Sequence, residues 1–147
     1  MKRMNINCPY CGSQALLRPA SVVYGSKAAD PAAPYYVCAR FPGCDSYVAA
    51  HRDTRSPMGS LADSGLRRKR AEAHRAFGRL WADGLMTRKQ AYRWLQAKLG
   101  LPEQETHIGK FSTFRCEQVI QLCGEFLILD GKPAQRYISY RRKEARL

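Results

Sequence analysis

Long hydrophobic runs are absent from this sequence of 147 residues. A helix needs about 18 or more consecutive apolar residues to cross a bilayer, so we expect no membrane-spanning segment. The start of the chain, Met1 to Asn5, is basic but leads into Cys8 and Pro9 rather than into an apolar stretch. It does not have the form of a secretory signal, and we therefore expect a cytoplasmic protein.

Acidic residues are scarce, with 12 Asp and Glu against 25 Lys and Arg, and the formal net charge is +13. Basic residues exceed acidic ones by four in residues 51–75 and by five in residues 132–147. A localised excess of positive charge is typical of proteins that bind a polyanion. Solubility alone is the alternative explanation, because net charge does not identify a partner.

Sequence patterns that carry catalysis are also missing. The chain has no nucleophile–base pattern, no glycine loop that would cradle a phosphate and no His-Glu-x-x-His motif. The carboxylates Asp30, Asp45, Asp53 and Asp63 do not follow the pattern of a two-metal nuclease. We expect that the protein is not an enzyme, although carboxylates brought together from distant positions would still permit a nuclease.

Two closely spaced pairs of cysteines are present near the N-terminus. Two residues separate Cys8 from Cys11, five separate Cys38 from Cys44, and 26 lie between the pairs. Zinc in structural sites prefers four tetrahedral ligands, and thiolates suit it well. A module of some fifty residues cannot bury much core, so a metal cross-link would supply the missing stability. We predict one structural Zn²⁺ bound by all four cysteines.

The same cysteines allow other interpretations. Cys8-Pro9-Tyr10-Cys11 matches the redox motif of glutaredoxins, but that chemistry needs the first thiol at a helix start in a βαβ fold. An iron–sulfur cluster could use the same thiolates, although their spacing fits no ferredoxin pattern. A disulfide framework would require a secreted protein. His51 could replace one cysteine, but it lies beyond the third expected strand.

The pattern of turns and apolar residues predicts an α+β protein. In residues 1–50 we expect an antiparallel β zinc ribbon, with strands at 35–38, at 46–50 and within 14–24. Pro19 interrupts the last of these, which predicts two short strand pieces or a broken edge strand. Gly12 and Gly43 can supply the backbone angles that the cysteine turns need.

Residues 51–59 have the composition of a linker, and residues 60–130 predict a helical unit of about three helices. Ser60-Leu61-Ala62-Asp63 and Thr87-Arg88-Lys89-Gln90 have the form of capping boxes. Ser112 can cap a third helix. Glycines at positions 84 and 100 would end the first two helices. One face of the third helix is predicted to carry Cys116, Ile120, Cys123 and Leu127. Residues 131–147 form a basic tail.

The two cysteine motifs resemble those of a known group of zinc ribbons. Cys8-Pro9-Tyr10-Cys11-Gly12 and Phe41-Pro42-Gly43-Cys44 are similar to the two turns of the ribbons at the C-terminal end of bacterial type IA topoisomerases. The resemblance covers roughly a third of the chain. It implies a short antiparallel ribbon that contacts single-stranded DNA.

Most of residues 8–123 also resemble a zinc-finger-containing family that is common in bacteriophages and prophages and has no established activity. This resemblance implies a phage or prophage origin, and hence the cytoplasm of a bacterial host cell. The residues that carry it are 8–24, 36–47, 59–63, 73–77, 91–95 and 107–109.

Aromatic and basic residues interleave near the cysteines, a pattern typical of surfaces that stack unpaired bases and hold phosphates. We predict contacts with nucleic acid, single-stranded DNA being favoured. The expected contact residues are Tyr24, Lys27, Tyr36, Arg40, Phe41, Tyr47 and Arg52 around the ribbon, Arg67, Arg68 and Arg70 on the first helix, and Arg141 and Arg142 in the tail. Roughly half of the rings would instead fill the small core, and the helix arginines would equally suit a solvated face.

A second hypothesis makes the chain a protein-interaction module. The ribbon and helical unit would dock on a host enzyme of the transcription, replication or defence machinery and modulate it. Small zinc modules serve both purposes, and an acidic partner surface would explain the positive charge as well as a phosphate backbone does.

Overall fold

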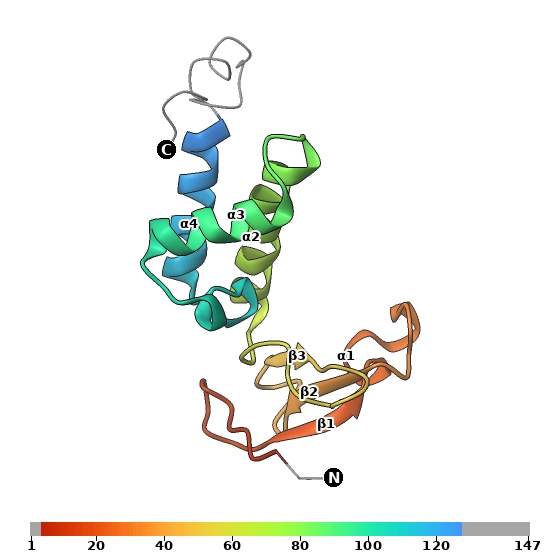
Figure 1. The fold of residues 1–147 in the computed structure, drawn as a ribbon. Coiled ribbons are helices and arrows are strands. Elements are labelled where there is room, and N and C mark those ends of the chain that lie inside the picture. The colour runs from red at the N-terminus through yellow and green to blue at the C-terminus, as the bar shows by residue number, and fades with distance from the viewer. Residues whose placement is uncertain (1–3, 128–147) are drawn as a thin grey trace. The chain divides into compact units, whose positions relative to one another are not determined.

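The computed structural model describes residues 4–127 (Figure 1). Its contacts divide the chain into two compact units, residues 1–68 and residues 69–147. In the part of the chain that the structure describes, no helix combines the length and the apolar character needed to cross a membrane.

The first unit contains a three-stranded antiparallel sheet in the order β1-β2-β3, as predicted. The strands are β1 (Ala15–Pro19), β2 (Pro34–Cys38) and β3 (Tyr47–Ala49). Side chains alternate between the two faces of a strand. In β2, Tyr35 therefore shares one face with Val37, whereas Tyr36 shares the other face with Cys38.

The segment after β1 is helical, so the predicted second strand piece within residues 14–24 is wrong. Pro19 ends the strand because it has no amide to donate to the ladder. The chain then forms α1 (Ser21–Tyr24), in which the amides of Val23 and Tyr24 donate to the carbonyl of Ala20 at 3.1 and 2.9 Å. A 3₁₀ turn, Gly25–Lys27, follows.

Residues that follow β3 pack on the ribbon. The amide of Met58 donates to the carbonyl of Ala49 at 2.8 Å, and Tyr47 and Ala62 exchange two backbone hydrogen bonds of 3.2 and 3.1 Å. Leu61 is 2% exposed and belongs to the same apolar cluster as Cys8 and Cys38. Ala62 thus pairs with the sheet instead of entering a helix, so the predicted helix start at Ser60 is wrong.

The first long helix begins four residues later. It is α2 (Ser64–Ala82), and the side chain of Asp63 caps it by accepting a hydrogen bond from the amide of Leu66 at 3.0 Å. Two more long helices follow, α3 (Arg88–Leu99) and α4 (Thr113–Phe126). Two 3₁₀ turns, Glu103–Glu105 and Ile108–Lys110, lie between them. With α1, the described residues contain four α-helices, three of them in the segment predicted to be helical.

The predicted caps of the later helices are confirmed. The hydroxyl of Thr87 accepts from the amide of Gln90 at 3.1 Å, and the Gln90 side chain accepts from the Thr87 amide at 2.9 Å. Gly100 ends α3 in the left-handed conformation with φ of +68°. The Ser112 hydroxyl accepts from the Arg115 amide at 3.2 Å at the start of α4.

The core of the second unit lies between α2, α3 and α4. The predicted apolar face of α4 is confirmed, since Cys116 and Cys123 are fully buried and Ile120 and Leu127 pack against them. The most deeply buried residues contributed by the other two helices are Ala73, Phe77, Leu80, Ala91 and Leu95.

Candidate zinc site and neighbouring surfaces

The sulfur atoms of Cys8, Cys11, Cys38 and Cys44 all lie within 4.8 Å of one another. The Sγ atoms of Cys8 and Cys44 are 3.6 Å apart, and those of Cys11 and Cys38 are 3.4 Å apart. These separations far exceed the bond length of about 2.05 Å in a disulfide. Four thiolates held at about 2.3 Å from a tetrahedral zinc ion would be about 3.8 Å from one another. The cluster therefore fits one zinc ion.

The first pair of cysteines is held by a tight turn. The amide of Gly12 donates to the carbonyl of Cys8 at 2.9 Å, and the amide of Tyr10 points at the Cys8 sulfur at 3.4 Å. Gly12 has φ of +79°, a conformation that a residue with a side chain rarely adopts. The expectation that this glycine supplies the turn geometry is therefore confirmed.

The second pair is held in the same way at the end of β2. The amide of Arg40 points at the Cys38 sulfur at 3.4 Å, and the amide of Cys44 donates to the carbonyl of Arg40 at 3.0 Å. Gly43 does not have a positive φ, contrary to expectation. A Cβ there would lie 3.3 Å from the Arg40 carbonyl oxygen, a tight contact that glycine avoids.

The pKa values of the four thiols shift in opposite directions. Hydrogen bonds from Ser13 lower the pKa of Cys11 to about 6. Desolvation, together with the neighbouring Cys8, raises the pKa of Cys44 to about 12, and burial also raises the pKa of Cys38. Four sulfurs this close cannot all be thiolates unless a cation neutralises them. The chemistry of the site thus favours a divalent metal ion.

Ser46 lies at this site with a buried side-chain hydroxyl that is not hydrogen-bonded in the described part of the chain. It is fully buried, its amide donates to the Cys44 carbonyl at 2.9 Å, and its carbonyl accepts from the Cys38 amide at 3.0 Å. Its hydroxyl has no hydrogen-bond partner among residues 4–127. Burial alone would raise the pKa of Cys8, but backbone amides, and the nearby Ser46 hydroxyl once Cys8 is a thiolate that can accept from it, bring that pKa below its ordinary value. The hydroxyl can therefore serve a thiolate at Cys8.

With four cysteine ligands a zinc ion has no open coordination position, so it is structural. Cys8, Cys11, Cys38 and Cys44 would hold it, and it would cross-link two turns that a small ribbon cannot fix by apolar burial alone. His51 is exposed and does not belong to the cluster.

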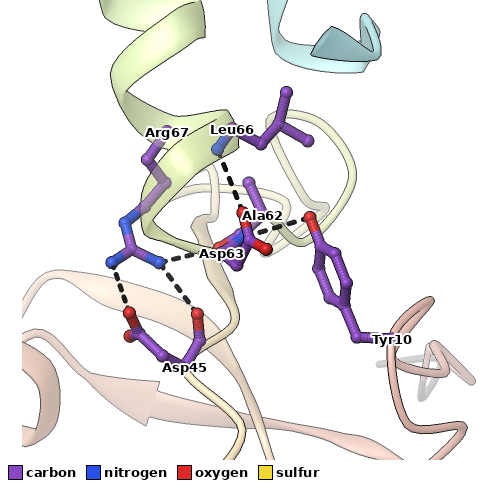
Figure 2. A network of polar contacts seen from close by, with 6 residues as sticks. All are labelled: Tyr10, Asp45, Ala62, Asp63, Leu66 and Arg67. Atoms are coloured by element: carbon purple, nitrogen blue, oxygen red, sulfur yellow. Dashed lines mark hydrogen bonds and ion pairs between the residues drawn. The ribbon is translucent and has the colours of Figure 1, made fainter.

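Hydrogen bonds join the start of α2 to both cysteine turns (Figure 2). The hydroxyl of Tyr10, in the first turn, accepts from the amide of Asp63 at 3.1 Å. The guanidinium of Arg67 donates to the carbonyl and the carboxylate of Asp45, both at 3.1 Å, and to the carbonyl of Ala62 at 2.8 Å. Asp45 directly follows the ligand Cys44. Any disturbance of the metal turns therefore reaches the start of this helix.

Four aromatic rings gather on the face of the sheet that carries Tyr35. We call them the aromatic face: Tyr24, Tyr35, Phe41 and Tyr47. They contact one another edge to face, with centroids 5.8 to 6.0 Å apart. Tyr24 is 42% exposed, Tyr35 and Phe41 are half-buried, and Tyr47 is buried beneath the Arg67 guanidinium, 3.9 Å from its ring centroid.

Three of the predicted nucleic-acid contacts have structural roles instead. Tyr36 is 5% exposed and its hydroxyl donates to the carbonyl of Arg55 at 2.7 Å. Tyr47 is buried within the aromatic face. Arg70 is also buried, and its Nε donates to the carbonyl of Phe111 at 3.1 Å. Buried rings cannot stack on bases and a buried guanidinium cannot reach a phosphate, so we do not retain these three.

Tyr24 and Phe41 belong to the aromatic face, and the other basic residues among the predicted contacts fall into three groups. Lys27, Arg40 and Arg68 are exposed. Arg52 is exposed but forms an ion pair with Asp30, and Arg67 is occupied by the bonds described above. Arg141 and Arg142 lie outside the described residues.

The predicted contact residues include Tyr36 but leave out Tyr35 and Arg18, which lie directly opposite each other on β2 and β1. Directly paired residues share a face, so the exposed Arg18 flanks the aromatic face. Alternation could have identified Tyr35. Tyr36 shares its face with Cys38, and a metal ligand faces the interior of the module, so Tyr35 must face the other way.

The comparison with protein families agrees with this site. The DUF3268 family model, described as a zinc-finger-containing domain, matches residues 4–126. No curated protein and no solved structure matches the chain. The likeness to topoisomerase ribbons and the phage origin stay predictions. Because the match spans most of the sequence, including the four clustered cysteines, the chain belongs to this family of zinc-finger-containing domains.

Proposed function

We propose that the protein binds single-stranded nucleic acid, with DNA favoured, through the aromatic face of its zinc ribbon. The observation that carries the proposal is the position of Tyr24. Its ring is 42% exposed and is held edge to face by two neighbouring rings. An exposed ring that its neighbours hold in place can stack on an unpaired base, a contact worth about 1–3 kcal/mol.

Three basic residues neighbour rings of the aromatic face, in the sheet pairing or in the sequence. Arg18 lies opposite Tyr35, Lys27 follows Tyr24 by three residues, and Arg40 precedes Phe41. All three basic side chains are exposed, and none forms an ion pair within residues 4–127. They are therefore free to hold phosphates on either side of a stacked base.

The metal site supports the same surface. Phe41 and Arg40 belong to the second cysteine turn, whose shape depends on Cys38 and Cys44. Zinc would therefore fix the position of one ring and one cation of the proposed surface without touching the nucleic acid.

The test is a salt-titrated binding measurement with labelled single-stranded DNA and the full zinc-loaded chain. Tyr24→Ala should weaken binding by about tenfold or more, and Arg40→Ala should reduce the salt slope by about 0.7. Phe114→Ala is the matched control, because that ring is 69% exposed but lies on α4. The proposal fails if the wild-type chain shows no binding at low salt, or if Tyr24→Ala and Phe114→Ala behave alike.

A protein partner is the second candidate function. Leu16 and Leu17, on opposite faces of the edge strand β1, are 39% and 41% exposed, and an exposed edge strand can pair with another protein chain. We propose capture of host proteins by the full chain after nuclease treatment as the test. A host enzyme that stays bound, and is lost with Leu16→Ser and Leu17→Ser, supports this function. A partner that nuclease releases points to a nucleic-acid bridge.

A further inference from the structure

Helix α3 has an unusual charge distribution for its length. Its twelve residues include Arg88, Lys89, Arg93 and Lys98 and no acidic residue. Lys89, Arg93 and Lys98 are exposed, and none of them forms an ion pair within residues 4–127. On α2, by contrast, Lys69 and Arg79 pair with acidic residues, although the exposed Arg68 and Arg75 do not. A helix surface with cations only and no internal partners is complementary to a polyanion.

The helix is rigidly placed within its unit. Ala91 and Leu95 are fully buried on one side, the Thr87 capping box fixes the first turn, and Gly100 ends the last turn. The side away from the core carries Lys89, Arg93 and Gln96 at i, i+4 and i+7, which places them in one row along the helix. Two of the three are exposed and Gln96 is half-buried.

The aromatic residues of α3 are occupied by packing. The Tyr92 ring contacts Phe77 with centroids 4.9 Å apart and lies beneath the Arg88 guanidinium. Trp94 contacts Phe126 at 5.5 Å. The row of Lys89, Arg93 and Gln96 thus has no free ring for stacking on unpaired bases. This arrangement favours double-stranded over single-stranded nucleic acid as the occupant.

The connection between α2 and α3 suits insertion into a groove. Residues 83–87 join the two helices, with Gly84 at φ of +78°, and α3 runs across α2 in Figure 1. Two crossing helices joined by a short glycine-containing turn can present the second helix to DNA. The major groove, about 12 Å wide, admits an α-helix, and Arg and Gln are side chains that bond base edges there.

We propose that the exposed row of α3, formed by Lys89, Arg93 and Gln96, is a contact surface for double-stranded DNA. The two cations would hold backbone phosphates or base edges, and Gln96 would reach a base edge. This surface is additional to the aromatic face of the ribbon, and the inference does not depend on that proposed function.

The experiment compares Arg93→Glu with the matched control Arg75→Glu in the full zinc-loaded chain. Arg75 is exposed on α2 without an ion pair in the described part of the chain, so both variants change the same residue type and the same net charge. Binding to a labelled duplex and to a single strand of equal length is measured over a salt series. The double variant Lys89→Ala, Arg93→Ala removes the cations without adding acidic charge, and circular dichroism checks the helices of each variant.

Arg93→Glu should weaken duplex binding at least about tenfold, against less than about threefold for Arg75→Glu. The double alanine variant should lower the salt slope by about two. Equal losses for the two glutamate variants would show that net charge alone governs binding and would overturn the inference, as would absence of duplex binding by the wild-type chain at low salt. If duplex binding depends on Arg93 but single-strand binding does not depend on Tyr24, the proposal for the ribbon is wrong and the proposal for α3 is supported.

Discussion

Ser46 carries the only buried side-chain nitrogen or oxygen in residues 4–127 that lacks a hydrogen-bond partner. A buried hydroxyl without a partner costs about 1–3 kcal/mol, so its persistence at a cluster of four sulfurs needs a reason. A thiolate at Cys8 accepts hydrogen bonds better than a thiol does. Binding of zinc would therefore satisfy the hydroxyl, and the hydroxyl would in turn stabilise the ligand.

Ser46→Ala should lower the affinity for zinc by about tenfold, because partners of metal ligands contribute on this scale. The measurement is competition with a chromogenic chelator. Ser26→Ala is the control, since Ser26 is exposed in the turn after α1. Wild-type affinity in Ser46→Ala would show that the hydroxyl does not assist the metal site.

The two cysteines outside the metal site should behave as inert core residues. Cys123 is fully buried, and burial raises its pKa to about 12 from an ordinary value of 9.0. At pH 9 an ordinary thiol would be half ionised, whereas Cys123 stays protonated and cannot attack an alkylating reagent. We predict by mass spectrometry that Cys123 remains unmodified at pH 9 in the folded chain and reacts in denaturant. Alkylation of the folded chain at a rate like that in denaturant would contradict this burial.

At the scale of single residues, the four ligands were predictable because thiolate pairs at short spacing have few other uses. The residues proposed to contact nucleic acid were harder to predict. Nothing in the sequence distinguishes Tyr36 and Tyr47 from the exposed Tyr24, and their burial depends on how each one packs in the folded ribbon. For Tyr36, strand alternation identifies the face, because Cys38 faces the metal and Tyr36 lies on the same side of the strand. No local pattern shows that Arg70 bonds a carbonyl 41 residues away.

Arg67 connects two elements, the ribbon and the first turn of α2. It makes three hydrogen bonds to Asp45 and Ala62 and covers the Tyr47 ring. Its neighbour Arg68 is exposed and has no ion pair within the described residues. Substitution of Arg68 is therefore a suitable control for substitution of Arg67.

Arg67→Ala should destabilise the ribbon by about 1–3 kcal/mol, because it leaves the Asp45 carboxylate and two carbonyls without their charged donor. Arg68→Ala should change stability by less than about 0.5 kcal/mol. Chelator-dependent unfolding followed by tyrosine fluorescence measures both. Similar midpoints for the two variants would show that the contacts in Figure 2 do not hold the helix start.

Helix ends were predictable where the signal is local. Thr87 with Gln90, Gly100 and Ser112 act through bonds to residues three or four positions away. The start of α2 was not predictable in this way. Ser60 to Asp63 has the form of a cap, but Ala62 pairs with Tyr47 in the sheet and Leu61 is buried beside the cysteines. Tertiary pairing overrode the local preference, and Asp63 became the cap.

At the scale of the whole chain, the two units obtain their stability in different ways. The second unit has a continuous core of ten buried residues, eight from three helices and two, Ile108 and Phe111, from the segment between α3 and α4. The buried cluster of the first unit is smaller and includes two of the four cysteines themselves. The ribbon should therefore depend on metal and the helical unit should not.

Removal of zinc with a chelator should unfold the ribbon and leave the helical unit folded. Both tryptophans of the chain, Trp81 and Trp94, lie in the second unit and pack against its core, so their fluorescence reports on that unit alone. We predict that chelation leaves the tryptophan emission maximum unchanged while tyrosine signals and sheet protection from hydrogen exchange are lost. A shift of tryptophan emission to the position seen in denaturant would show that the whole chain requires the metal.

The most direct test of the metal site is native mass spectrometry of freshly reduced protein. We predict one zinc ion per chain in the wild type and in Cys123→Ala, and loss of zinc in Cys8→Ser and in Cys38→Ser. A wild-type chain that stays metal-free when zinc is supplied, or one zinc retained in a variant with both serine substitutions, would contradict this prediction.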